Sequence, residues 1–200
     1  MSTIPIDLET DNVVLPPPQL PSGVTLEQAL KSRSSARDYL EDTLPLETVS
    51  ALLWAAFGIN RPDSGGRTAP SAHDWQEIDV YAVLAEGGFL YDARAHRLML
   101  VKAQDLRALT GTQDFPATAP LNLVYVADFA KMTDVRPQDR EFLAGADAGF
   151  IAQNVYLACA AFGLGTVARG LVDRSSLAPA LGLSLTQRIT LAQTVGLPRR

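Results

Sequence analysis

The stretch from Ala144 to Gly170, AGADAGFIAQNVYLACAAFGLGTVARG, constrains the fold of this chain most strongly. Up to about Phe162 it is apolar on nearly all sides, and a helix of this composition is buried over most of its surface. Asp147, Gln153 and Asn154 interrupt the apolar run, so it does not meet the requirement of a membrane-spanning helix. The sequence therefore predicts the central helix of a folded core. Its many alanines would let another helix approach closely, either from the same chain or from a second subunit.

The second part of the stretch, GLGTVARG, allows two interpretations. Gly163 is typical of the left-handed residue that ends a helix, and residues 166–168 then form a short strand. Gly163 to Ala168 also matches G-x-G-x-x-A, a variant of the dinucleotide-binding fingerprint. That fingerprint needs a strand before it and a helix after it, whereas here the helix comes first. We therefore reject dinucleotide binding. A simple chain reversal and a backbone that passes close to a planar ligand remain open.

The composition argues against several classes of protein. A chain of 200 residues suits one domain with a sizeable core, and a net charge of −5 without a basic run argues against a nucleic-acid or membrane-surface protein. The single cysteine, Cys159, lies within the apolar helix and is expected to be a core thiol. His73 and His96 have no metal-ligand spacing, so we expect no metal. The N-terminus lacks the pattern of a signal peptide, which favours a cytoplasmic location.

The N-terminal 23 residues are predicted to form an extended arm, ahead of a single domain over residues 24–200. Prolines at positions 16, 17, 18 and 21 prevent a helix. A disordered tail and an arm lying across the domain or a partner are both compatible with this segment. Its apolar residues, which could anchor an arm, are Ile4, Ile6, Leu8, Val13 and Leu15.

A basic segment follows the first predicted helix. Thr25 and Gln28 form a capping box at the start of that helix. The helix leads into Arg33, Ser34, Ser35 and Arg37, which offer guanidinium and hydroxyl donors suited to an anion. The alternative is a solvated basic helix end that complements the helix dipole.

The remaining pattern predicts helices interleaved with strands. We expect helices at 46–57, 105–109 and 174–181, strands at 78–84, 121–127 and 188–195, a hairpin over 89–101, and loops at 59–75, 111–120 and 132–137. This order predicts an α+β (mixed α/β) domain, with a central mixed sheet packed around the long buried helix.

Taken together, these stretches resemble the nitroreductase superfamily of flavin enzymes, and look closest to its SagB-type dehydrogenase branch. The resemblance covers nearly the whole chain. It is carried by LPPP at 15–18, R-S-S-x-R-x-Y at 33–39, ALLWAAFGIN at 51–60, TAPSA at 68–72, G-x-x-Y-D at 88–92, Gln113, residues 144–167 and VGLP at 195–198.

The resemblance implies a nitroreductase-like fold and a homodimer that holds FMN at the subunit interface. It implies ping-pong transfer of hydride from NAD(P)H through FMN to a small electron-poor acceptor of the nitro or quinone type. The alternatives are a SagB-type dehydrogenase that oxidises a ring in a modified peptide, a flavin-binding module without turnover, and an α/β domain without flavin.

The same resemblance assigns roles to individual residues. Arg33, Ser34, Ser35 and Arg37 match the positions that hold the FMN phosphate and reach towards the ring, and Arg199 or Arg200 could complete that site. Pro70, Ser71 and Ala72 match a loop that lies against the partner's flavin. Gln113 matches a contact to the pyrimidine end, and the backbone of Arg169 and Gly170 matches the turn facing flavin N5. No side chain need be a nucleophile, because the chemistry belongs to the cofactor.

Three residues depart from the family pattern. Arg169 stands where several members have an acidic residue, and its side chain is expected either to point to solvent or to favour acidic substrates. His73 and Asp74 replace small residues that usually follow the serine. His73 is expected to be a solvent-exposed loop histidine, with proton donation to substrate as the alternative.

Overall fold

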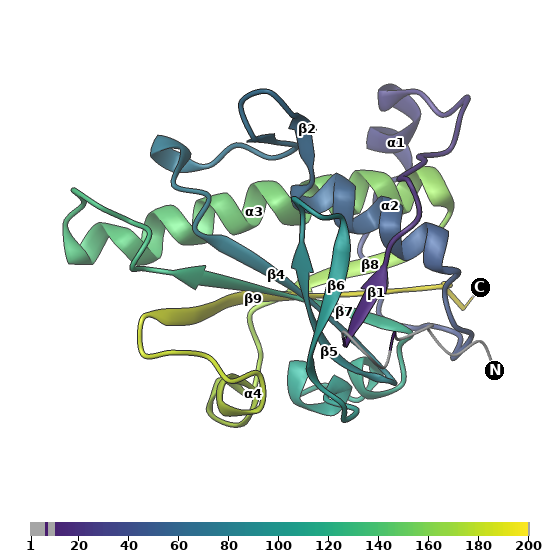
Figure 1. The fold of residues 1–200 in the computed structure, drawn as a ribbon. Helices are drawn as coiled ribbons and strands as arrows, with labels where there is room; N and C mark the ends of the chain where they lie inside the picture. The colour runs from purple at the N-terminus through teal and green to yellow at the C-terminus, as the bar shows by residue number, and fades with distance from the viewer. Residues whose placement is uncertain (1–6, 8–10, 200) are drawn as a thin grey trace.

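The computed structural model describes residue 7 and residues 11–199, which form an α+β fold (Figure 1). Its α-helices are α1 (Leu26–Ser32), α2 (Leu46–Phe57), α3 (Pro137–Phe162) and α4 (Arg174–Ala180). Three short 3-10 helices are η1 (Ala72–Asp74), η2 (Arg107–Thr110) and η3 (Phe115–Ala117). The strands are β1 (Asn12–Val14), β2 (Ile59–Arg61), β3 (Gly66–Arg67), β4 (Ile78–Leu84), β5 (Gly87–Asp92), β6 (Arg97–Lys102), β7 (Leu121–Asp128), β8 (Gly165–Arg169) and β9 (Gln187–Gly196).

Seven of these strands form one sheet in the order β1-β6-β5-β4-β7-β9-β8. The prediction of an α+β fold is confirmed, but the prediction of a mixed sheet is wrong, because all pairings within this sheet are antiparallel. The reason lies in the last strand. The α3 crossover leaves β7 and β8 running in the same direction, and β9 then fills the gap between them and pairs antiparallel with both.

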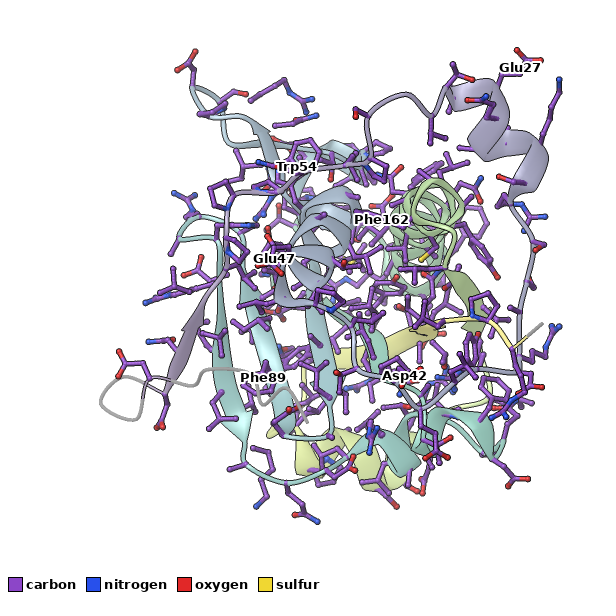
Figure 2. All side chains as sticks on the ribbon, turned by 90° about the vertical axis from the view of Figure 1, so that its right-hand side faces the viewer. Glu27, Asp42, Glu47, Trp54, Phe89 and Phe162 are labelled. Atoms are coloured by element: carbon purple, nitrogen blue, oxygen red, sulfur yellow. The ribbon has the colours of Figure 1, made fainter. Side chains whose placement is uncertain are left out.

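Both faces of the sheet are covered. Along β4, Val80 and Ala82 belong to the core beneath α2 and α3, whereas Tyr81 and Val83 belong to a second core against α4. Figure 1 shows α4 on the side of the sheet opposite α2 and α3, and Figure 2 shows α2 and α3 side by side above the strands. Burial on both faces explains why β4 and β7 are apolar at most positions, with Asp79, Asn122 and Asp128 as the charged or amide side chains among them.

Helix α3 has the boundaries that its sequence signals indicate. Pro137 occupies its first turn, and Gly163 ends it in the left-handed conformation, with φ of 71°. Cys159 is fully buried, and burial raises the pKa of its thiol, so it is a core residue as predicted. In the described part of the chain no helix combines the length and apolar character needed to cross a membrane.

The N-terminal segment joins the sheet in its described part. Strand β1 pairs with the edge of β6, and Val13 and Leu15 are buried in the main core. The His96 ring lies within 2.7 Å of the Ser50 hydroxyl and 3.1 Å of the Pro16 carbonyl, which ties the proline-rich stretch to α2. The apolar residues Ile4, Ile6 and Leu8 lie outside the described residues, and the division into an arm and one domain stays a prediction.

The loop expected over residues 59–75 contains local structure. Strands β2 and β3 pair as a small separate hairpin, and η1 follows before β4. Proline and glycine in this stretch favoured turns, but they did not reveal the hairpin because each of its strands has only two or three residues.

We expect Ile151→Ala in α3 to destabilise the protein by about 2–5 kcal/mol, because Ile151 is fully buried and its truncation leaves a cavity. The matched control is Leu185→Ala, since Leu185 is 92% exposed. Urea unfolding followed by circular dichroism measures both. Equal losses in the two variants would contradict the packing described for α3.

Candidate functional site

The basic segment after α1 runs along the outer edge of β8. Ser35 forms a parallel bridge with Thr166, and the Ala36 amide donates to the Thr166 carbonyl at 3.0 Å. Further on, Tyr39 bridges Pro198. Since β8 is the last strand of the sheet, this segment covers part of an edge that would otherwise be free.

Close approach at this edge depends on a glycine. A Cβ on Gly165 would lie 2.8 Å from the Cβ of Ala36 and 3.2 Å from the Cβ of Pro198. Gly165, which the sequence offered as part of a possible ligand turn, therefore allows three chain segments to pack together. The segment carrying the arginines gains its position from this contact.

Tyr156 of α3 organises the polar groups beside this edge. Its hydroxyl lies 3.0 Å from Ser35 Oγ and accepts a hydrogen bond from the Ala168 amide at 2.9 Å. The guanidinium of Arg33 lies 5.3 Å from the centre of its ring. Sequence reasoning missed Tyr156. The sequence signal for a polar site was the tyrosine hydroxyl itself, which follows Gln153 and Asn154 closely in an otherwise apolar helix.

The alternation along β8 sets the direction of its backbone groups. The Thr166 carbonyl and the Ala168 amide both point away from β9, towards Ala36 and Tyr156. Strand β8 ends at Arg169, and Gly170 follows it as an exposed bend residue whose carbonyl accepts from Arg174 Nη1 at 3.0 Å. The same guanidinium donates to the Ile189 and Thr190 carbonyls of β9, so Arg174 joins the expected turn to that strand.

The predicted phosphate-binding residues lie together on the surface. Ser34, Ser35 and Arg37 are exposed and Arg33 is half-buried. In the described ranges, neither Arg33 nor Arg37 takes part in an ion pair. Their charge is therefore not neutralised by a carboxylate.

The C-terminal arginine of the described chain is already engaged. Arg199 Nε donates to Asp38 Oδ1 at 3.2 Å, and Nη2 donates to the Tyr39 carbonyl at 3.3 Å. Arg199 thus ties the chain end to the basic segment and lies close to it. Arg200, the other predicted completion of the phosphate site, lies outside the described residues.

The predicted flavin-facing loop lies elsewhere within one chain. The Ala72 amide donates to Asp147 of α3 at 2.8 Å, whereas the arginine segment lies against Tyr156. These two helix residues are nine positions apart, so they face opposite sides of α3 and are separated by about 13 Å along its axis. The structure therefore does not bring Pro70, Ser71 and Ala72 together with the arginines of the same chain.

The turn after this loop has a constrained backbone. His73 has φ of 52°, and its exposed ring stacks on Trp75 with 4.6 Å between the ring centres. His73 is thus the exposed loop histidine that was expected. Proton donation by His73 to a substrate stays a prediction.

Gln113 lies between η2 and η3. Its Oε1 atom is buried and has no hydrogen-bond partner among the described residues. Nearby, Phe115 lies 5.8 Å from the Tyr39 ring, so this loop contacts the end of the basic segment. Gln113 therefore offers an unused buried acceptor near the predicted site.

Both expectations for the Arg169 side chain are wrong. It is 6% exposed and points into the protein, neither to solvent nor towards a substrate. Its guanidinium donates to the Thr110 carbonyl at 2.7 Å, to Asn122 Oδ1 at 3.1 Å and to Thr194 Oγ1 at 3.1 Å. Desolvation lowers its pKa to about 10, so it stays charged at neutral pH.

The physical reason for this orientation is a polar pocket built into the sheet. Asn122 and Thr194 are directly opposite each other in β7 and β9, and both are fully buried. Gly111 leaves the necessary space, because a Cβ there would lie 2.1 Å from Arg169 Nη1. A polar residue at position 122 of an apolar strand was the signal that sequence reasoning did not use. Arg169 therefore fixes the loop that carries Gln113.

Comparison with known proteins decides the family. The profile described as Nitroreductase family matches residues 30–197, which include all the site segments except the chain end. This chain belongs to the nitroreductase family. Closeness to the SagB-type branch is not specifically supported.

Two relatives are similar over most of their length. A protein named a putative nitroreductase, from Methanocaldococcus jannaschii, is 32% identical over 165 residues, covering 76% of this chain and 82% of its own. The crystal structure of a protein titled a putative nitroreductase, from Ralstonia eutropha, is 42% identical with a TM-score of 0.90, covering 98% of this chain and 93% of its own.

A third structure shares the fold at lower identity. It is titled a putative nitroreductase in complex with FMN, from Desulfovibrio desulfuricans, and is 23% identical with a TM-score of 0.64. The match covers 88% of this chain and 87% of that one. In this nitroreductase-family chain, the segment at Arg33 to Arg37 lies along β8, and Gly170 follows the end of that strand.

We expect Arg169→Met to destabilise this nitroreductase by about 2–4 kcal/mol, because the buried Thr110 carbonyl loses the donor shown for it and Asn122 Oδ1 loses one of its two donors. Arg188→Met is the matched control, since Arg188 is exposed and binds only nearby carbonyls. Urea unfolding at neutral pH measures both. A loss for Arg169→Met no larger than that of the control would show that these hydrogen bonds do not hold the loop.

Proposed function

We propose that this protein is an FMN-dependent oxidoreductase that acts as a homodimer. It takes hydride from NAD(P)H and passes it to a small electron-poor organic acceptor in a ping-pong cycle. The observation that carries the proposal is the edge of β8, along which lies a segment with two arginines, Arg33 and Arg37, that form no ion pair among the described residues.

The basic segment suits the phosphate end of FMN. A flavin phosphate carries close to two negative charges, and arginine pairs answer such a group with charge-assisted hydrogen bonds. Arg33 and Arg37 lack carboxylate partners among the described residues, while Ser34 and Ser35 add hydroxyl donors. Arg199 pairs with Asp38, the residue after Arg37, and is therefore a third candidate cation for the phosphate. The role of Arg200 in the phosphate site stays a prediction.

We assign the ring end of FMN to the turn that follows β8 and to Gln113. The backbone of the exposed Gly170 is assigned to flavin N5, because a main-chain donor can hold that atom without acting as an acid. The side-chain oxygen of Gln113 has no hydrogen-bond partner among the described residues and suits the N–H of a pyrimidine ring. When bound, FMN would supply the hydride chemistry, and the protein supplies binding and orientation.

A second copy of the chain would complete the site. Within one chain, Pro70, Ser71 and Ala72 lie on the far side of α3 from the arginines, so they cannot contact the same ring. Large apolar side chains remain exposed on α1 and α3, as expected for a subunit interface. These are Leu26, Leu30, Phe142 and Phe150. Dimerisation through these helices would bring the loop of one subunit to the flavin of the other.

The double variant Arg33→Ala with Arg37→Ala tests the phosphate site. We expect FMN affinity to fall by at least about tenfold, because each charged hydrogen bond contributes about 1.5–3 kcal/mol. The control is Arg61→Ala with Arg94→Ala, which removes two exposed arginines elsewhere. Quenching of FMN fluorescence gives both affinities. Unchanged FMN affinity in the first double variant would rule out the assigned phosphate site.

Anaerobic spectroscopy tests the reductase half-reaction. The protein reconstituted with FMN is expected to lose its visible flavin absorption when NADH or NADPH is added under nitrogen. Adding a quinone or a nitroaromatic compound should then restore the absorption, as a ping-pong cycle requires. A flavin spectrum that neither nucleotide bleaches would favour a storage module or a dehydrogenase that its own substrate reduces.

A further inference from the structure

A pair of buried carboxyl groups lies beneath the predicted flavin-facing loop. Glu77 precedes β4 and is 0% exposed, while Asp147 of α3 is 4% exposed. Carboxylates are almost never fully buried unless they are paired or hydrogen-bonded. The contacts of these two groups therefore need an explanation that the proposed chemistry on FMN does not supply.

Each carboxyl group accepts a hydrogen bond from the same short turn. Ser71 Oγ donates to Glu77 Oε2 at 3.0 Å, and the Ala72 amide donates to Asp147 Oδ2 at 2.8 Å. Ser71 Oγ also accepts from the Gln76 amide at 2.9 Å, which closes the turn on itself. The two carboxyl groups thus hold two adjacent residues of the loop against two different elements of the core.

The turn needs such external support. His73, Asp74 and Gln76 all have positive φ, between 49° and 55°, although none is glycine. Each such residue raises the free energy of the folded backbone, and the conformation persists only where surrounding contacts impose it. The hydrogen bonds to Glu77 and Asp147 are contacts of this kind.

One oxygen of the pair lacks a donor. Glu77 Oε1 is buried without a hydrogen-bond partner among the described residues. The Asp147 carboxyl lies beside Glu77, since the two groups bind the adjacent residues Ser71 and Ala72. Two ionised carboxylates in contact would repel, whereas one shared proton converts the contact into a hydrogen bond. Burial raises the pKa of Glu77, and Asp147 raises it further.

Other charged groups around the pair do not neutralise it. Arg67 donates to Gln76, Asp79 pairs with Lys131, and Asp128 accepts from Ala130 and Thr186. His73 and Asp74 are exposed in the turn itself, and Arg140 lies two helical turns before Asp147 on the same side of α3. In the described part of the chain none of these forms an ion pair with Glu77 or Asp147.

We propose that Glu77 and Asp147 are positioning residues that share one proton, and that this singly protonated pair holds Ser71 and Ala72 in the conformation that contacts the partner's flavin. Loss of the shared proton leaves two like charges in contact and loosens the turn. The proposal rests on the proposed function only for the flavin contact. The effect of the proton on the turn is a property of the chain itself.

The sign of the pH dependence follows from the raised pKa of Glu77. The protonated pair stabilises the turn fully at any pH below the ordinary pKa of a glutamate carboxyl. This stabilisation is lost as the pH rises through the raised pKa that Glu77 has in the folded protein. Glu77→Gln mimics the protonated group, since its amide can donate to Asp147 and accept from Ser71. This variant should therefore keep the turn in place at every pH.

The first experiment follows the turn in the absence of flavin. Hydrogen exchange of the amides of Ala72 and Gln76, corrected for the intrinsic effect of pH, is measured from about pH 5 to pH 9 for the wild type, Glu77→Gln and the exposed control Glu47→Gln. We expect protection to fall with pH in the wild type and the control, and to stay constant in Glu77→Gln. Asp147→Asn, which can donate to Glu77 Oε1, should behave like Glu77→Gln if the latter folds poorly.

The second experiment follows FMN affinity over the same pH range. The ratio of affinities of Glu77→Gln and the wild type is expected to be near one at low pH and to reach about tenfold or more at alkaline pH. A purely structural role for Glu77 would give a ratio that does not change with pH.

Amide protection tests the shared proton, whereas the affinity ratio tests whether the turn contacts the flavin. Equal pH dependence of amide protection in the wild type, Glu77→Gln and Asp147→Asn would overturn the shared proton. A pH-dependent turn combined with a constant affinity ratio would support the proton pair, but would place the turn away from the flavin and so contradict that part of the proposed function.

Discussion

The packing of α3 across one face of the sheet is the interaction on which both the core and the site depend. The sheet-facing side of the helix buries Ala144, Ala148, Ile151 and Val155 against the central strands. Because most of these side chains are small or β-branched, the helix lies close to the sheet and parallel layers can form without large voids. The same helix then carries Tyr156 on one side and Asp147 on another. One rigid element therefore sets the positions of two loops that are far apart in the sequence.

Polar groups inside this fold have defined partners, and those partners lie in loops. Arg169 binds the η2 end through Thr110, and Asp147 binds the turn at Ala72. A buried polar group costs free energy unless it is hydrogen-bonded, so each of these contacts fixes a single loop conformation. The apolar core supplies most of the stability, while these few polar contacts decide where the loops lie. In a protein that orients a cofactor, loop position decides function.

The proposed cofactor site likewise combines a rigid core with loops that polar contacts hold in place. The edge of β8 fixes the backbone of the adjacent segment, and Arg33 to Arg37 present long cationic side chains from it. A bulky anionic cofactor suits such an arrangement, because rigid donors orient its ring and long side chains follow its phosphate. The loop at Ser71 and Ala72 belongs to the opposite side of α3, which makes a second subunit part of the proposed site.

Most of the longer helices and strands, and the segments that match the family, could be predicted from the sequence. Helix 46–57 and strand 78–84 were predicted with their observed bounds, and Pro137 and Gly163 marked the two ends of α3, because caps and periodicity are local properties. The antiparallel pairing of the whole sheet could not be predicted, since the insertion of β9 between β7 and β8 depends on which strands pair in space. The tertiary structure also turned Arg169 inward and brought Glu77 to Asp147, residues 70 positions apart. The burial and pairing of a charged side chain depend on what surrounds it in space, and no local pattern records those neighbours.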